Sequence, residues 1–233
     1  MTYFSLVIPL FNEEKNIENL VKEIFFYLNE IKNFELILVN DGSFDNTNLT
    51  IKKLKNFYNI KIIENNKNYG QSFSLKVGIE NSKFKTIVTL DGDGQNNPKD
   101  ILKLLNHYNS NKEILLVGGI RKNRKDNFIK IISSKVANKI RSLILNDQCR
   151  DTGCSLKIFD KDVFLTFPFF DGIHRFLPAL YKGFGKKTYF IDVDHRPRIY
   201  GISKYGTFDR MFRGVRDLIK VAKIIKKFKE KRA

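Results

Sequence analysis

The sequence predicts a single α/β domain with a mostly parallel central sheet, and three observations support this prediction. Short apolar runs rich in β-branched residues alternate with segments whose apolar residues recur at helical spacing, which is typical of parallel strands joined by helical crossovers. Carboxylates follow directly after two of the apolar runs, at Asp41 and at the pair Asp91 and Asp93. The 233 residues contain no linker or internal repeat and fit the usual length of one domain.

The elements are expected in the following order. Apolar runs predict strands at 4–10, 35–40, 60–63, 86–90, 114–118 and 187–193, with a shorter strand ending at Phe159. Helical spacing predicts helices after Asn12, from about Asp45, from Gln71, after Pro98, over 128–145 and from Thr207 onward. Asn12 is expected to cap the first helix. The helix over 128–145 is expected to bury Ile132, Val136, Ile140 and Leu143.

The last segment of the chain is strongly basic. Residues 1–206 are expected to form the α/β domain, and residues 207–233 a basic amphipathic helix with an apolar side made of Val215, Leu218, Ile219, Ala222 and Ile225. Such a helix can dock on the domain or lie on an anionic bilayer, and the sequence leaves both interpretations open. No window approaches the roughly 18 apolar residues that a membrane span requires, so no span is expected.

The amino-acid composition limits the kinds of binding partner and of protein that need to be considered. A net charge of +17, from 42 Lys and Arg against 25 Asp and Glu, favours anionic partners such as nucleic acid, an acidic membrane or phosphorylated small molecules. A hydrophobic content of 42% with 21 Phe excludes disorder. Two Cys and three His form no zinc framework and favour a reducing compartment.

The stretch Asp91-Gly92-Asp93-Gly94-Gln95 follows a buried strand, where α/β proteins bind ligands. Two neighbouring carboxylates repel each other unless a cation lies beside them. Mg²⁺ and Mn²⁺ take oxygen ligands and commonly join carboxylates to substrate phosphates, and Gln95 adds a neutral oxygen. A plain acidic turn is the alternative interpretation. Neither G-x-G-x-x-G nor a P-loop is present, so a nucleotide would have to be held in another way.

With these residues in view, the chain resembles the family 2 nucleotide-sugar glycosyltransferases, and within them the dolichol-phosphate mannosyltransferases and their bacterial polyprenyl-phosphate relatives. The resemblance covers nearly the whole chain and implies the single-domain GT-A fold, which is Rossmann-like. Its motifs are Val7 to Glu13 (VIPLFNE), Val39 to Ser43 (VNDGS), Asp91 to Gln95 (DGDGQ), Asp151 to Cys154 (DTGC) and Arg198 to Tyr205 (RIYGISKY).

The resemblance also implies roles for individual residues. The nucleoside would be held by Pro9, Phe11, Glu13 and Asp41. Asp91, Asp93 and Gln95 would place Mg²⁺ or Mn²⁺ on the donor diphosphate, which Arg198 and Lys204 would grip. The acceptor phosphate would bind at Arg121, Lys130 and Ser134, and the family usually has Arg at the place of Lys130. Asp93, Arg121, Arg198 and Lys204 make up the expected catalytic set.

The implied activity is an inverting, metal-dependent transfer of a hexose, with mannose expected, from a nucleotide-diphosphate sugar (GDP-mannose or a UDP-sugar) to a polyprenyl or dolichyl phosphate. The implied setting is peripheral, on the cytoplasmic face of an anionic membrane, with a separate membrane-spanning partner left open and no nucleic acid. A lipid phosphate is largely ionised at neutral pH, so this nucleophile needs no general base.

Two other functions stay open at this point. Transfer to a sugar hydroxyl of a cell-surface glycan would need a carboxylate base, for which Asp151 and Asp171 are the candidates. A non-catalytic module for anionic membranes or nucleic acid would explain the charge but not the three carboxylates at one sheet edge. Asp171-Gly172 is equally interpreted as a turn and His174 as a structural histidine.

Overall fold

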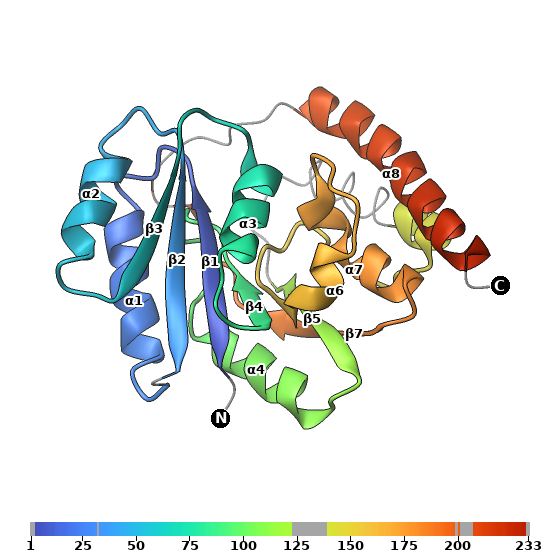
Figure 1. The fold of residues 1–233 in the computed structure, drawn as a ribbon, viewed down its shortest axis with the longest axis horizontal. Coiled ribbons are helices and arrows are strands. Elements are labelled where there is room, and N and C mark those ends of the chain that lie inside the picture. Colours follow the sequence, from blue (N-terminus) through green and yellow to red (C-terminus); the bar gives the residue numbers. More distant parts are fainter. Residues whose placement is uncertain (1–2, 32, 123–138, 199, 201–206, 232–233) are drawn as a thin grey trace.

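The computed structural model describes residues 3–31, 33–122, 139–198, 200 and 207–231. Its strands are β1 (Phe4–Leu10), β2 (Phe34–Asp41), β3 (Ile60–Asn65), β4 (Thr86–Thr89), β5 (Ile114–Arg121), β6 (Lys157–Asp160) and β7 (Lys187–Val193) (Figure 1). Its helices are α1 (Ile17–Tyr27), α2 (Thr47–Leu54), α3 (Gln71–Glu80), α4 (Asp100–Ser110), α6 (Lys161–Leu165), α7 (Ile173–Gly183) and α8 (Thr207–Glu230). Residues 139–145 are helical as well.

The strands form one seven-stranded sheet in the order β3-β2-β1-β4-β6-β5-β7. Strand β6 runs antiparallel to its neighbours β4 and β5, and every other pairing is parallel. The expected mostly parallel α/β domain is therefore confirmed. Because β6 is reversed, it begins at the sheet edge where its neighbours end, and Lys157 pairs there with Thr89 and Gly118.

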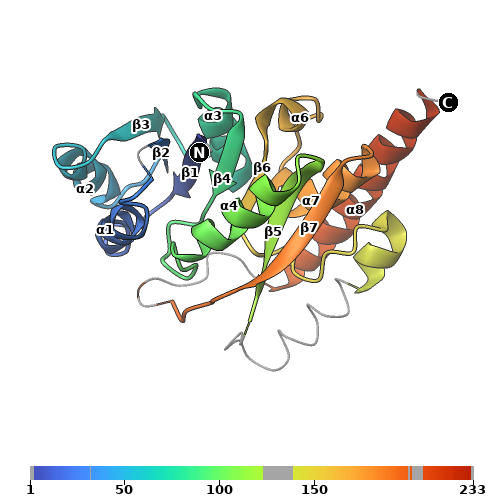
Figure 2. The same ribbon diagram turned by 90° about the horizontal axis from the view of Figure 1, so that it is seen from below.

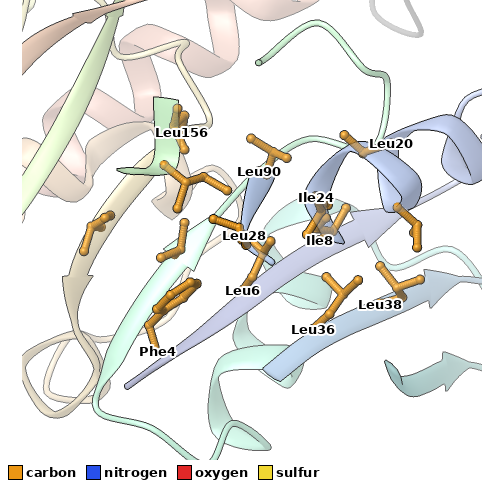
Figure 3. Packing of buried hydrophobic residues seen from close by; sticks show 14 of the residues in the cluster. Phe4, Leu6, Ile8, Leu20, Ile24, Leu28, Leu36, Leu38, Leu90 and Leu156 are labelled. Carbon is orange, nitrogen blue, oxygen red and sulfur yellow. The ribbon is translucent and has the colours of Figure 1, made fainter. Parts of the chain in front are cut away.

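The core lies on both faces of the sheet because successive residues of a buried strand point to opposite sides. In β1, Leu6 and Ile8 belong to a cluster that includes residues of α1, α2 and α4. Figure 3 shows the two side chains on the same side of the sheet as Leu20 and Ile24 of α1. Val7 packs on the other face with residues of α3, α7 and α8. The result is a sheet between two helical layers, which Figure 2 shows from below.

The first helix starts later than the sequence predicts. Helix α1 begins at Ile17, and Asn12 does not cap it. Asn12 instead has a φ of 54°, a left-handed conformation that Asn tolerates better than most residues. Its Oδ1 accepts from the Phe44 N–H at 3.1 Å, and its own N–H donates to Ser43 Oγ at 3.0 Å. Asn12 therefore ties the loop after β1 to the loop after β2.

The predicted buried face of the helix over 128–145 is wrong for the part that the structure describes. Ile140 and Leu143 are 50% and 76% exposed, whereas Arg141 and Leu145 are buried. The physical reason is an ion pair between Arg141 Nε and Asp147 Oδ2 at 2.9 Å, which turns this side of the helix inward. Ile132 and Val136 lie outside the described residues.

Helix α8 docks on the domain, with Leu218, Val221 and Ile225 buried against α7 and its neighbours. Asp217 is 4% exposed and accepts from Arg175 Nη2 of α7 at 3.1 Å. The apolar side predicted from the sequence is wrong in part, because Val215 and Ile219 are each 54% exposed. Among the described segments, no helix combines the length and the hydropathy needed to cross a bilayer.

Candidate active site

The functional residues gather at one edge of the sheet. Strands β1, β2, β5 and β7 end there, β4 ends two residues before Asp91, and β6 begins there. The loop that carries Asp91 and Asp93 packs closely on β1: a Cβ on Gly92 would lie 2.4 Å from Leu10 Cδ2, so a larger residue would have to displace this buried side chain. This close approach places the carboxylate pair directly beside the loop after β1.

Each carboxylate of the pair is held by hydrogen bonds. Asp91 Oδ1 accepts from Gln71 Nε2 at 2.7 Å, and the Asp91 N–H donates to Ser155 Oγ at 3.2 Å. Asp93 Oδ1 accepts from the Gln95 N–H at 3.1 Å, and Asp93 Oδ2 accepts from Arg198 Nη2 at 2.6 Å. The expected pair is thus brought together, in an orientation that Gln71 and Arg198 define.

The electrostatics of the pair favour an additional cation. Burial raises the pKa of Asp91 to about 6, and the neighbouring charge of Asp93 acts in the same direction. Lys157 and Arg121 oppose this shift. Among the described residues, no three His, Cys, Asp or Glu side chains gather closely enough to hold a metal on their own. Two carboxylates and an amide leave part of a coordination shell to a ligand, which is the usual arrangement for Mg²⁺ on a diphosphate.

Arg198 reaches Asp93 because residues 193–198 cross the loop that contains Gln95. The Arg196 N–H donates to the Gln95 carbonyl at 2.8 Å, and Arg196 Nη1 contacts both carboxylate oxygens of Glu23 on α1 at 2.9 and 2.8 Å. Burial alone would lower the pKa of Arg198, but the hydrogen bond to Asp93 raises it above its ordinary value. Lys204, the second expected diphosphate ligand, lies outside the described residues.

Asp41 holds the loop between β3 and α3. Its Oδ1 accepts from Asn65 Nδ2 at 2.8 Å and from the Tyr69 N–H at 3.0 Å, and its Oδ2 accepts from the Gly70 N–H at 2.8 Å. An ionised carboxylate offers about four acceptor positions. Described residues of the chain use three of these positions, so Asp41 is held firmly at the end of β2.

The other three residues expected at the nucleoside lie on β1 and the loop after it. Pro9 is the penultimate residue of β1. The Phe11 ring meets Phe44 edge-on, with ring centroids 5.6 Å apart. Glu13 is buried, its Oε2 accepts from Asn16 Nδ2 at 2.7 Å, and its N–H donates to Thr47 Oγ1 at 2.8 Å. The structure therefore brings these residues to the same loop region as Asp41.

Arg121, expected at the acceptor phosphate, forms a bidentate ion pair with Asp151. Arg121 Nε donates to Asp151 Oδ2 at 2.7 Å, and Nη2 donates to Oδ1 at 2.8 Å. Burial lowers the pKa of Arg121, but the bonds to Asp151 outweigh burial and raise it. Asp151 thus serves as the counter-ion of Arg121. Lys130 and Ser134, the other two expected acceptor ligands, lie outside the described residues.

His174 lines a small cavity beside Asp91. The cavity is about the size of one water molecule, whose centre could occupy about 10 Å³, and Gln71, Ser155 and Lys157 line it as well. Ser72 Oγ accepts from the Gly172 N–H at 2.8 Å and lies 2.7 Å from His174 Nδ1. A serine hydroxyl has one donor and two acceptor positions, so this contact holds the imidazole whichever ring nitrogen carries the proton. The interpretation of His174 as a structural histidine is consistent with this contact.

Burial lowers the pKa of His174 to about 3, and the charges of Arg175 and Lys157 act in the same direction. The unfolded chain binds this proton below a pH of about 6.5, so the contribution of His174 to stability is complete above that pH and declines towards pH 3. We expect the free energy of unfolding to fall by about 2 kcal/mol between pH 7 and pH 5 on this account.

Urea titrations of the unchanged protein and of His174→Gln at both pH values check this prediction. The variant should lose that part of the decline, while a control variant at the exposed His107, which stacks on Tyr189, should keep it. An imidazole NMR signal of His174 that titrates near pH 6.5 would contradict the prediction.

The sequence is similar to those of several bacterial proteins. It is 37% identical over 223 residues to a dodecaprenyl-phosphate galacturonate synthase of Rhizobium johnstonii, covering 93% of this chain and 65% of that protein. It is 32% identical over 208 residues to an undecaprenyl-phosphate 4-deoxy-4-formamido-L-arabinose transferase of Shewanella sediminis, covering 88% of this chain and 62% of that protein. The chain thus spans somewhat less than two thirds of the length of these relatives.

Solved structures share the fold. The glucosyl-3-phosphoglycerate synthase of Mycobacterium tuberculosis, in complex with Mn²⁺, UDP and glucosyl-3-phosphoglycerate, superposes with a TM-score of 0.70 at 15% identity, over 94% of this chain and 78% of that one. The mannosyl-3-phosphoglycerate synthase of Rubrobacter xylanophilus gives 0.71 at 12% identity, over 94% and 73%. The expected GT-A fold is confirmed. The model of the family "Glycosyl transferase family 2" matches residues 5–166, and the chain belongs to this family.

Proposed function

We propose that the chain transfers a sugar from a nucleotide diphosphate to a polyprenyl phosphate. Both relatives described above carry names of polyprenyl-phosphate sugar transferases or synthases. The observation that carries the proposal is the ion pair between Arg121 and Asp151. In this ion pair the Asp151 carboxylate, one of the two candidate bases, is bound to the guanidinium of Arg121. This is expected when the acceptor is an anion, which needs no base because it brings its own negative charge.

In the proposed reaction, a phosphate oxygen of the acceptor attacks the anomeric carbon of the sugar from the side opposite the diphosphate. A new carbon–oxygen bond forms, the bond to the diphosphate breaks, and the nucleoside diphosphate leaves with the electron pair, so a single displacement inverts the configuration. Arg121 would bind the acceptor phosphate and Arg198 the diphosphate, since guanidinium groups suit both oxyanions. His174 cannot accept a proton at neutral pH because its pKa is about 3.

Asp91, Asp93 and Gln95 would hold a divalent cation on the donor diphosphate, since they provide oxygen ligands and the raised pKa of Asp91 reflects burial beside a second carboxylate. When bound, Mg²⁺ or Mn²⁺ would neutralise charge that develops on the departing diphosphate. The Mn²⁺ in the complex with the Mycobacterium tuberculosis enzyme supports this assignment by analogy of fold.

The names of the relatives suggest which sugar the donor carries. The sequence resemblance favours mannose, whereas the relative with 37% identity is named for galacturonate, so we propose galacturonate first and mannose second. Undecaprenyl phosphate should be incubated with UDP-galacturonate, UDP-glucose and GDP-mannose in parallel, with Mn²⁺ present, and lipid products separated by mass. A glycosylated lipid phosphate with one of these donors supports the proposal, and inert lipid with all three speaks against it.

We further assign the outward side of α8 and residues 139–145 as the surface that meets an anionic membrane. The two helices lie alongside each other in Figures 1 and 2, where residues 139–145 are yellow and α8 is red. They expose Val215, Ile219, Ile140, Leu143 and Ile144, together with Arg216, Lys220, Lys223, Lys226 and Lys227. Exposed apolar side chains among basic ones are typical of membrane-surface helices.

We expect the double variant Lys223→Glu, Lys227→Glu to bind vesicles containing phosphatidylserine at least roughly 30-fold more weakly, because each basic residue near an anionic surface contributes about 1 kcal/mol. Sedimentation with the vesicles at low and high salt measures this effect. The matched control Lys53→Glu, Lys55→Glu changes the same charge at the end of α2, where both lysines are exposed. Equal losses in both double variants would mean that only net charge matters.

A further inference from the structure

We propose that Gln71 is a positioning residue that fixes the carboxylate of Asp91 for cation binding. This inference rests on the proposed function, because it assigns a role toward the metal on the donor diphosphate. Gln71 is the first residue of α3, and its side-chain Nε2 lies 2.7 Å from Asp91 Oδ1. It belongs to none of the sequence motifs that point to the site, yet it touches the first carboxylate of the pair.

The chemistry of the contact fixes its direction. An ionised carboxylate only accepts hydrogen bonds, so the Gln71 amide must present its nitrogen to Asp91. A hydrogen bond from a neutral amide orients the carboxylate without supplying a positive charge that would compete with a metal ion. Gln71 differs in this respect from Arg198, whose guanidinium neutralises Asp93 directly. Gln71 thus gives Asp91 a neutral side-chain donor, whereas Arg198 gives Asp93 a charged one.

The backbone on the N-terminal side of Gln71 is fixed by Asp41. Gly70 has a φ of 91°, a conformation that glycine adopts readily, and its N–H donates to Asp41 Oδ2 at 2.8 Å. The Tyr69 N–H donates to Asp41 Oδ1 at 3.0 Å. Because Asp41 is the last residue of β2 and is buried, it anchors the start of α3 to the sheet.

The backbone on the C-terminal side of Gln71 is fixed by Ser72. Ser72 Oγ accepts from the Gly172 N–H at 2.8 Å and lies 2.7 Å from His174 Nδ1, so it links the start of α3 to the start of α7. Gln71 is therefore held between two anchored neighbours, and its side chain reaches Asp91 from a rigid support. A rigid support is what a residue needs in order to orient a metal ligand.

The substitution Gln71→Met removes the donor and keeps the length of the side chain and a high helix propensity. Partners of this kind typically contribute about 10- to 100-fold to metal affinity, and we expect a loss of about that size for Mn²⁺. The matched control is Lys76→Met on the same helix, where the ammonium pairs with Glu80 in the last turn of α3. Mn²⁺ binding is measured from the EPR signal of the free ion, alone and with UDP or GDP, and Tm is measured for every variant.

The expected result is weaker Mn²⁺ binding by Gln71→Met, with a Tm close to that of the unchanged protein and with normal binding by Lys76→Met. Unchanged Mn²⁺ affinity in Gln71→Met would overturn the positioning role and leave the proposed function in place. A large fall in Tm accompanied by lost binding would also overturn it, since Gln71 would then support the fold as a whole. If the unchanged protein itself binds no Mn²⁺ with either nucleotide, the metal assignment of the proposed function fails, and the role of Gln71 fails with it.

Discussion

Asp93→Asn is expected to reduce sugar transfer by at least about 10³-fold. A bound metal ion contributes several kcal/mol of charge stabilisation in the transition state, and each step of about 1.4 kcal/mol corresponds to a factor of ten in rate. The fold should be nearly unaffected. The amide side chain in the variant keeps an oxygen that can accept from the Gln95 N–H, a bond of 3.1 Å in the native chain. The substitution loses the ion pair with Arg198 but also removes the repulsion between Asp93 and Asp91, and these two changes offset each other.

Steady-state transfer assays with Mn²⁺ and thermal unfolding check this prediction together. Tm should shift by no more than about 2–4 °C, which is the change that 1 kcal/mol produces in a domain of this size. The control Asp162→Asn removes a carboxylate that pairs with Lys85 at 2.6 Å on the outer surface, and it should leave transfer unchanged. An Asp93→Asn protein that transfers sugar at the native rate would contradict the assignment of the site.

Arg198→Gln is expected to have opposite effects on two ligands. In the structure the Arg198 guanidinium binds Asp93 Oδ2 at 2.6 Å, so it competes with a cation for that oxygen. In the proposed complex the same guanidinium binds the donor diphosphate. Without nucleotide, the variant should therefore bind Mn²⁺ more tightly than the unchanged protein. Its affinity for a nucleoside diphosphate should fall about 10- to 150-fold, the equivalent of roughly 1.5–3 kcal/mol for a charge-assisted hydrogen bond.

Isothermal titration of Mn²⁺, UDP and GDP into the purified protein separates these effects. Arg196→Gln is the matched control, because Arg196 lies two residues earlier and pairs with Glu23 on α1 rather than with Asp93. Weaker Mn²⁺ binding in Arg198→Gln would mean that Arg198 supports the cation site instead of competing for it. Unchanged nucleotide affinity would remove Arg198 from the diphosphate site.

The parts of the fold that depend on local pattern could be predicted from the sequence. Strand β1 occupies the expected residues 4–10, and the loop with Asp91 and Asp93 emerges at the expected edge. The start of the first helix could not be predicted, because Asn12 has the residue type of a cap while its side chain bonds to Phe44, 32 residues away. The exposure of Ile140 could not be predicted either, since it results from the buried pair of Arg141 and Asp147.

The same distinction holds for the site. Motifs identify residues that lie close together in sequence, such as Asp91, Asp93 and Gln95. Contacts between distant segments carry no local signal, and Gln71 with Asp91 and Arg121 with Asp151 are separated by 20 and 30 residues. A buried carboxylate such as Asp151 was therefore open to interpretation as a base until its partner was known. A basic residue at the end of a neighbouring strand is the sequence feature that would have indicated an ion pair with Asp151.

The central claim is that an ionised phosphate on a lipid is the nucleophile. The most direct measurement compares undecaprenyl phosphate with undecaprenol as acceptor, at equal concentrations in the same vesicles, with the donor that proves active and with Mn²⁺. The proposed reaction requires that only the phosphate is glycosylated and that the product releases its sugar and lipid phosphate on mild acid treatment. Transfer to the hydroxyl of undecaprenol, or to a glycan hydroxyl while undecaprenyl phosphate stays inert, would contradict the claim.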